Sequence, residues 1–146
     1  EAIDLNINET MFSFEPSEEE RTDASFGEVE KYLIEPFSSI LKAGAFKSFG
    51  NRFDLRKLAP NSHLFTCTDL PENLPARVFR IFEEVSPNKK EMKRRFPSGK
   101  VNIITRNYAI GAEALKKKLG LKDGGNDFLI GTKTTSGFKI YWCKLA

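Results

Sequence analysis

The sequence has very little of the side chains that most catalytic and metal sites require. It contains one histidine, His63, and two cysteines, Cys67 and Cys143, among 146 residues. A lone histidine without Cys or His at ligand spacing does not predict a metal site. An independent enzyme would need a pocket that joins His63 to converging carboxylates, and the sequence offers no such nucleophile–base arrangement. We therefore expect no catalytic, cofactor-binding or metal-binding residue in this chain.

Long apolar runs and glycine-rich nucleotide motifs are absent as well. No segment approaches the roughly 18 to 20 apolar residues that a membrane-spanning helix needs, and P-loop, GxGxxG and HExxH motifs are missing. The opening "EAIDLNINET" is acidic and lacks both a secretion signal and an initiator Met, so we expect a fragment of a longer protein. The lack of a long apolar run predicts no membrane association. Two cysteines in strand-like stretches predict buried free thiols and a cytoplasmic location.

Charge is distributed very unevenly along the chain. The net charge is only +3, yet residues 1–35 hold eleven acids and two bases, a net −9. Residues 86–122 hold eleven bases and two acids, a net +9. Such polarity is informative about partners rather than about fold. The basic segment could face an external anion or the acidic segment of its own chain, and both alternatives stay open.

The first half of the sequence predicts a small mixed structure. "IDLNIN" and "MFSFEP" alternate apolar and polar residues, which indicates half-buried strands, and an uncovered apolar face of "MFSF" would favour a dimer of this fragment. Residues 37–49 have helical spacing, with Pro36 before the first turn, Gly44 in the middle and Gly50 as the expected stop. "HLFTC" predicts a strand. "DLPENLPA" contains two prolines, and we place the domain boundary there.

The second half predicts a β-α-β-α-β-β order with helices on one face of a mostly antiparallel sheet. Ser86 is the expected N-cap and Pro87 the first helical residue. Gly120 is the expected stop of the second helix. The expected elements are a strand at 77–85, a helix at 88–96, a strand at 100–108, a helix at 111–120 and a hairpin at 127–145 that turns near Ser136–Gly137.

Both predicted helices of the second half carry many cations. The candidates for contact with a polyanion are Lys89, Lys90, Lys93 and Arg94 on the first helix, and Lys116, Lys117 and Lys118 on the outer side of the second. At this density, Lys and Arg would hold a nucleic-acid backbone without reading its sequence. Tyr108 and Tyr141 could stack on unpaired bases. The alternative is an ordinary solvated or self-paired helix surface.

Two stretches resemble a known family. "YLIEPFSSILKAGAF" (32–46) and "RNYAIGAEALKKKLGLKDGGNDFLIGTK" (106–133) are similar to the C-terminal region of class I S-adenosylmethionine-dependent methyltransferases typical of Bacteroidetes, and "PNSHLFT" and "RVFRIFEEV" also fit. The resemblance covers most of residues 24–144. Phe37 and Ser38 depart from the small or polar residues usual after "EP", and Asn126 stands where the family commonly has Asp.

The resemblance implies an α+β fold: a ferredoxin-like segment at residues 1–75, followed by a small THUMP-like domain at residues 76–146. THUMP domains are RNA-binding modules of tRNA-modifying enzymes, so RNA, with tRNA as one class, is the implied partner. S-adenosylmethionine would bind the absent N-terminal methyltransferase domain, which is the second implied partner. The expected function is therefore a non-catalytic, RNA-recognising accessory region. The alternative is a docking domain that supports the methyltransferase domain without binding RNA.

Overall fold

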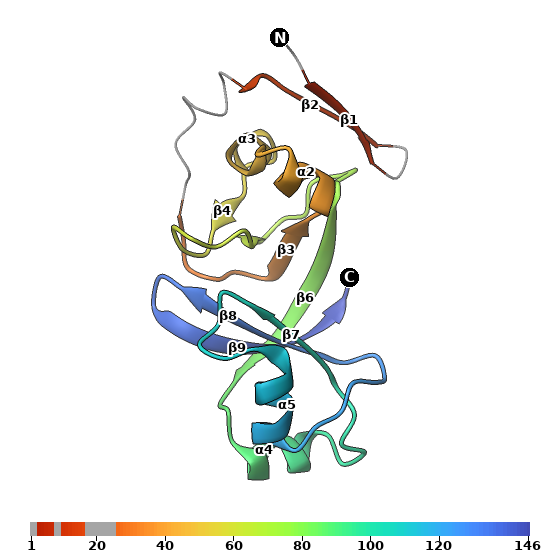
Figure 1. The fold of residues 1–146 in the computed structure, drawn as a ribbon, viewed down its shortest axis with the longest axis vertical. Helices are drawn as coiled ribbons and strands as arrows, with labels where there is room; N and C mark the ends of the chain where they lie inside the picture. The colour runs from red at the N-terminus through yellow and green to blue at the C-terminus, as the bar shows by residue number, and fades with distance from the viewer. Residues whose placement is uncertain (1–2, 8–9, 17–25) are drawn as a thin grey trace. The chain divides into compact units, whose positions relative to one another are not determined.

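The computed structural model describes residues 3–7, 10–16 and 26–146 (Figure 1). The chain divides into two compact units between Val78 and Phe79. Within the described part of the chain, no helix combines the length and the apolar character that crossing a bilayer demands. Each unit has its own hydrophobic cluster.

The first unit begins with the two predicted strands. β1 (Ile3–Ile7) and β2 (Thr10–Phe14) pair in antiparallel register, with Ile3 opposite Phe14. The hairpin confirms the two strands that were predicted for this segment. The acidic stretch at residues 17–25 lies outside the described residues, and the expected dimer through "MFSF" stays a prediction.

A small antiparallel sheet and two short helices complete the first unit. The strands β3 (Tyr32–Pro36), β4 (Arg56–Lys57) and β5 (Phe65–Cys67) lie in the order β4-β5-β3. The single helix predicted at 37–49 is wrong, because the chain forms α2 (Ser38–Lys42) and α3 (Phe46–Arg52) instead. Gly44 has φ of +72°, a left-handed conformation that ends α2, and it has open space around it.

Gly50, the expected stop, lies inside α3 for a packing reason. A Cβ on Gly50 would come within 2.5 Å of the Phe65 ring, so the helix and strand approach more closely than any larger residue permits. Phe49 and Phe65 also meet edge to face, with ring centroids 5.4 Å apart. The glycine is therefore needed for helix–sheet contact and not for helix termination.

The second unit has the predicted β-α-β-α-β-β order. Its sheet runs β6-β9-β8-β7, and only the β7–β8 pair is parallel, as expected for strands joined by a crossover helix. This arrangement confirms the α+β fold class. The elements are β6 (Ala76–Val85), α4 (Lys89–Arg95), β7 (Asn102–Arg106), α5 (Ala112–Leu119), β8 (Phe128–Thr134) and β9 (Gly137–Leu145).

Both helices of this unit pack on the same side of the sheet. Met92 of α4 and Leu115 of α5 are fully buried and share one cluster with Ile103 of β7 and Ile140 of β9. The N-cap of α4 differs from the prediction. Asn88, and not Ser86, accepts a hydrogen bond through Oδ1 from the Glu91 backbone N–H at 3.2 Å, so the helix begins two residues later.

The loop after α5 is tied to β7 by one carboxylate. Gly120 adopts φ of +68° and ends α5, as predicted. Asp123 Oδ1 then accepts the backbone N–H of Ile103 at 3.0 Å, while its second oxygen pairs with the Lys116 ammonium. We call these three groups the Asp123 clamp. It joins the helix, the loop and the edge strand of the sheet.

A core substitution tests the packing of the second unit. Leu115→Ala should lower the free energy of unfolding by about 2–5 kcal/mol, because it leaves a cavity among fully buried neighbours. Lys117→Ala, on the exposed side of the same helix, should change it by about 0.5 kcal/mol or less. Urea unfolding followed by the fluorescence of Trp142, the single tryptophan, measures both. Equal losses in the two variants would contradict the packing described here.

The Asp123 clamp predicts a pH dependence of stability. Hydrogen bonds from Lys116 and then from the Ile103 N–H lower the pKa of Asp123. The ionised carboxylate therefore stabilises the folded state above its unfolded-state pKa of about 3.9, and this stabilisation is lost as pH falls through the lower folded-state pKa. Asp123→Asn should reduce stability near neutral pH, and its difference from wild type should shrink in acid.

The same urea titrations at near-neutral and acidic pH check this expectation. Glu113→Gln serves as the matched control, because Glu113 also contacts Lys116 but its side chain is 86% exposed. A difference between Asp123→Asn and wild type that stays constant across the pH range would refute the clamp.

Candidate functional site

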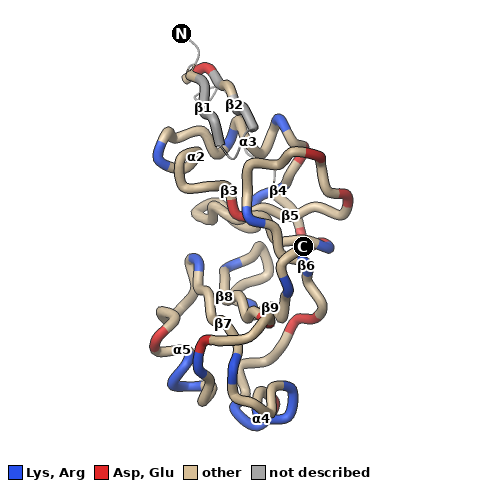
Figure 2. The backbone as a smooth tube through the Cα atoms, turned by 90° about the vertical axis from the view of Figure 1, so that its right-hand side faces the viewer, with Lys and Arg blue, Asp and Glu red and all other residues tan. Residues whose placement is uncertain are grey.

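Four of the seven predicted cations of α4 and α5 line one region of the second unit. Figure 2 shows Lys and Arg positions along α4 and α5. A depression of about 230 Å³ lies between α4 and the end of α5, lined by Lys89 and Lys93 together with Gly99, Gly120 and Leu121. A second, open depression shares Gly120 and Leu121 with it.

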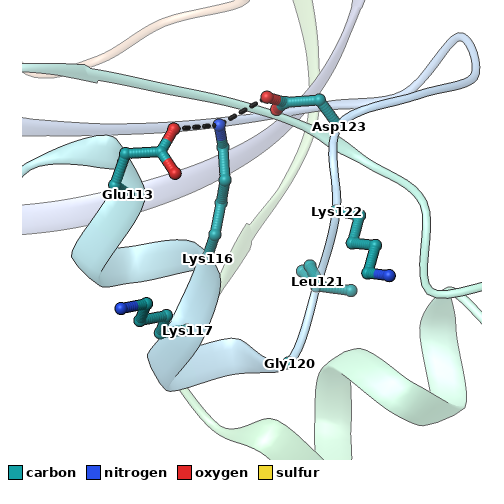
Figure 3. Close-up of a pocket in the computed structure, with 7 residues that line it drawn as sticks. All are labelled: Glu113, Lys116, Lys117, Gly120, Leu121, Lys122 and Asp123. Carbon is teal, nitrogen blue, oxygen red and sulfur yellow. Dashed lines mark hydrogen bonds and ion pairs between the residues drawn. The ribbon is translucent and has the colours of Figure 1, made fainter.

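Figure 3 shows the second depression, to which Lys117 and Lys122 contribute. We call the surface formed by Lys89, Lys93, Lys117 and Lys122 around Gly120–Leu121 the basic groove. Its four cations come from two helices and the loop that follows α5. Lys122 was not among the candidates from the sequence, and it belongs to the groove because the turn at Gly120 brings it back beside α5.

The floor of the basic groove is fixed by backbone hydrogen bonds. The Lys122 N–H donates to the Gly99 carbonyl, and the Val101 N–H donates to the Lys122 carbonyl, both at 2.9 Å. Lys89 lies across Gly120, where an added Cβ would come within 2.9 Å of Lys89 Cε. Gly120 thus allows the Lys89 side chain to reach the end of α5. The lysines of two helices are thereby held beside one rigid turn.

Lys116 does not lie on the outer side of α5 as the sequence suggested. Its ammonium lies between the carboxylates of Glu113, at 2.7 Å, and Asp123, and its side chain is only 16% exposed (Figure 3). These hydrogen bonds, Asp123 first, raise the pKa of Lys116. Its charge is therefore largely balanced within the protein. Lys117 and Lys122 point away from this ion pair (Figure 3).

Three further predicted cations lie outside the basic groove: one is ion-paired and two are exposed. Arg94 donates to both oxygens of Glu91, at 2.7 and 2.8 Å, although its side chain is 73% exposed. Lys90 and Lys118 are exposed and are not among the residues that line the two depressions. Of the seven candidates, Lys89, Lys93 and Lys117 belong to the basic groove.

The predicted aromatic contacts are only partly available. Tyr141 is only 6% exposed, so the prediction that a base stacks on this ring is wrong. Successive side chains of a strand point to opposite faces of the sheet. Ile140 and Trp142 of β9 pack toward the helices, so Tyr141, which lies between them in the sequence, points to the other face. Tyr108 is half-buried against Gly131, and burial raises its pKa. Strand alternation could have predicted that Tyr141 and Trp142 face opposite sides, but not which side is covered.

His63 and the cysteines lie in structural settings. The His63 ring packs on Phe46, with centroids 4.8 Å apart, and burial and then Lys57 lower its pKa. Cys67 and Cys143 are buried free thiols, as predicted. Burial raises the pKa of Cys67 to about 11, with Glu30 and Asp69 adding to the effect, and burial raises that of Cys143 to about 12. The described residues contain no group of three potential metal ligands.

The glycine pair Gly124–Gly125 does not fit an S-adenosylmethionine site. It lies between α5 and β8, whereas nucleotide-binding glycines lie between a strand and the helix after it. Asn102 donates to the Gly125 carbonyl at 2.9 Å and to the Asp127 carbonyl at 3.2 Å, which fastens this turn to β7. The turn is therefore part of the sheet framework.

Comparison with known proteins gives two domain matches. Residues 32–75 match a ferredoxin-like domain, and residues 76–144 match a THUMP domain-like model. An uncharacterized S-adenosylmethionine-dependent methyltransferase, found in two strains of Mycobacterium tuberculosis, is 24% identical over 108 residues, which are 72% of this chain and 30% of that protein.

A solved structure matches most of the chain. The chain is similar to the crystal structure of a "putative methyltransferase" from Porphyromonas gingivalis W83, with a TM-score of 0.83 and 32% sequence identity. The matched region includes 94% of this chain and 35% of the Porphyromonas chain. The chain thus spans about a third of the length of these relatives. On the domain matches and this structural likeness, residues 32–75 form a ferredoxin-like domain and residues 76–144 form a THUMP-like domain.

Proposed function

We propose that this chain is a non-catalytic accessory region of a cytoplasmic S-adenosylmethionine-dependent methyltransferase, and that its basic groove binds the RNA substrate. The THUMP-like match and the methyltransferase relatives support the accessory role. In this proposal the remaining part of the protein holds S-adenosylmethionine and performs the transfer. tRNA is one substrate class that fits, because THUMP modules occur in tRNA-modifying enzymes.

The single observation that carries RNA binding is the basic groove. Lys89, Lys93, Lys117 and Lys122 surround a recess whose floor is fixed backbone. Clustered lysine ammonium groups bind phosphate oxygens and displace counterions from the nucleic acid, which gives sequence-independent affinity with a steep dependence on salt. The groove would therefore position an RNA backbone, and base recognition would need further contacts.

A second candidate function is a docking domain that supports the methyltransferase domain without touching RNA. The observation in its favour is that Arg94, Arg95 and Lys116 are ion-paired with carboxylates of the same unit. Paired charges of this kind stiffen a domain and attract a polyanion less strongly. Under this function the four lysines of the groove would face solvent or a carboxylate surface of the catalytic domain.

RNA titration of the 146-residue chain at low and moderate salt separates the two functions. Wild type should bind with a steep salt slope. Replacing Lys89 and Lys93 together by Ala should weaken binding and reduce the slope of log K against log salt by about 2, at about 1 per phosphate contact. Replacing Lys90 and Lys118 removes the same charge outside the groove and should have a much smaller effect.

Absence of binding by wild type at low salt would favour the docking function. Equal losses in the two double variants would show that overall charge, and not the basic groove, attracts RNA. Urea unfolding of each variant confirms that the lysine replacements leave the fold intact.

A further inference from the structure

Phe82 is placed at the surface by an irregularity in β6. Ile81 lies opposite Cys143 and Glu83 lies opposite Trp142, so Phe82 is an extra residue without a partner in the register. Such bulges redirect a side chain and often occur near functional sites. Phe82 as a residue is 49% exposed. A single exposed apolar residue is common on protein surfaces, so the surroundings of this ring decide its significance.

Trp142 forms a rigid backing for Phe82. The two ring centroids are 5.6 Å apart with planes tilted by 42°, and Phe96 meets Trp142 edge to face at 5.6 Å. The Trp142 indole N–H also donates to Asp127 Oδ1 at 2.9 Å. Trp142 is therefore fixed by packing and by a hydrogen bond. An aromatic surface that is already ordered loses little conformational freedom when a ligand stacks on it.

Two cations lie beside the exposed ring. The guanidinium carbon of Arg80 and the Nζ of Lys144 are each 5.8 Å from the Phe82 centroid, and the two residues are directly paired across β6 and β9. These distances are close to the limit of about 6 Å for a cation–π contact, so the contacts are weak. Both side chains are long enough to turn from the ring toward an anion next to it.

The neighbouring carboxylates are already engaged: Glu83 by Arg95, and Asp127 by Trp142 and, at a longer distance, by Lys144 itself. Glu83 accepts hydrogen bonds from Arg95 at 2.6 and 2.9 Å, and this pairing lowers the pKa of Glu83. Asp127 accepts the Trp142 N–H and lies 3.9 Å from Lys144. The acids of this region therefore orient Arg95 and Trp142 behind the platform. Arg80 and Lys144 flank the exposed ring.

We propose that Phe82, supported by Trp142, is a stacking site for an unpaired RNA base whose adjacent phosphates are bound by Arg80 and Lys144. This inference rests on the proposed RNA-binding function and specifies its substrate as RNA with a single-stranded segment. Every base has a π-face, so such a site accepts different sequences. A base inside a duplex is already stacked on its neighbours and cannot reach the ring. The basic groove would then hold the backbone elsewhere on the same RNA.

The chain contains a matched control for this site. Phe138 is 51% exposed and lies near one cation, Lys133, at 5.7 Å, and one aromatic ring, Tyr108, at 5.7 Å. It follows the β8–β9 turn and is not part of a bulge. Phe138→Ala thus removes a ring of equal exposure without touching Phe82. A general effect of exposed aromatic rings would appear in both variants.

Fluorescence anisotropy with a labelled oligouridine and with an RNA duplex of the same length tests the proposal. Phe82→Ala should weaken oligouridine binding about 5- to 150-fold, which corresponds to about 1–3 kcal/mol of base–aromatic stacking. Duplex binding should not change, and Phe138→Ala should leave both affinities unchanged. Phe82→Leu, which keeps an apolar side chain at the bulge, should show most of the loss if stacking is the cause.

The remaining outcomes distinguish a failure of the proposed RNA-binding function from a failure of the Phe82 stacking site alone. If wild type binds neither RNA, the proposed function fails and the stacking site fails with it. If Phe82→Ala binds oligouridine as wild type does, while the Lys89 and Lys93 double variant is weakened, only the stacking site is overturned. Equal losses on single-stranded and duplex RNA would also overturn it. Trp142 fluorescence in urea titrations shows whether each variant is folded.

Discussion

The basic groove depends on the Asp123 clamp, which ties the loop after α5 both to the helix and to the sheet. One carboxylate joins the Ile103 N–H of the edge strand to the Lys116 ammonium of α5. The helix, the returning loop and the parallel strand pair are thereby held in one arrangement. The same loop supplies Gly120 and Leu121, which lie at the centre of the basic groove. The basic groove is therefore formed around the turn at Gly120 and Leu121, and hydrogen bonds hold the loop that contains this turn in place.

Charge in this unit serves two physical purposes. Glu83, Glu91 and Arg95 form a hydrogen-bonded network along one side of α4, while Lys89 and Lys93 line the groove on another side. A helix turns by about 100° per residue, so a run of mixed charges is divided between its sides. The net charge of this segment therefore overstates how many cations an RNA could contact. Which cations are ion-paired and which line the groove is more informative for RNA binding.

Much of the fold follows from periodicity, and most errors come from tertiary contacts. Alternation and helical spacing predicted the β-α-β-α-β-β order, because burial repeats with the geometry of each element. Gly44 was expected in the middle of a helix and Gly50 at its end, but Gly44 ends α2 and Gly50 lies inside α3. The sequence could not show this, because only the packing reveals that Gly50 lies against the Phe65 ring. Tyr141 and Lys116 were misplaced for the same reason. The bulge at Phe82 depends on the register with β9, which the sequence of one strand does not contain.

The two buried thiols have a practical consequence for chemistry on this protein. Thiolates, and not thiols, react with maleimides and iodoacetamide, and burial keeps both Cys67 and Cys143 protonated at neutral pH. A cysteine introduced on the surface would then be the one rapidly alkylated position in the folded chain. A spectroscopic label or photo-crosslinker could be attached at such a position without first removing the native sulfhydryls.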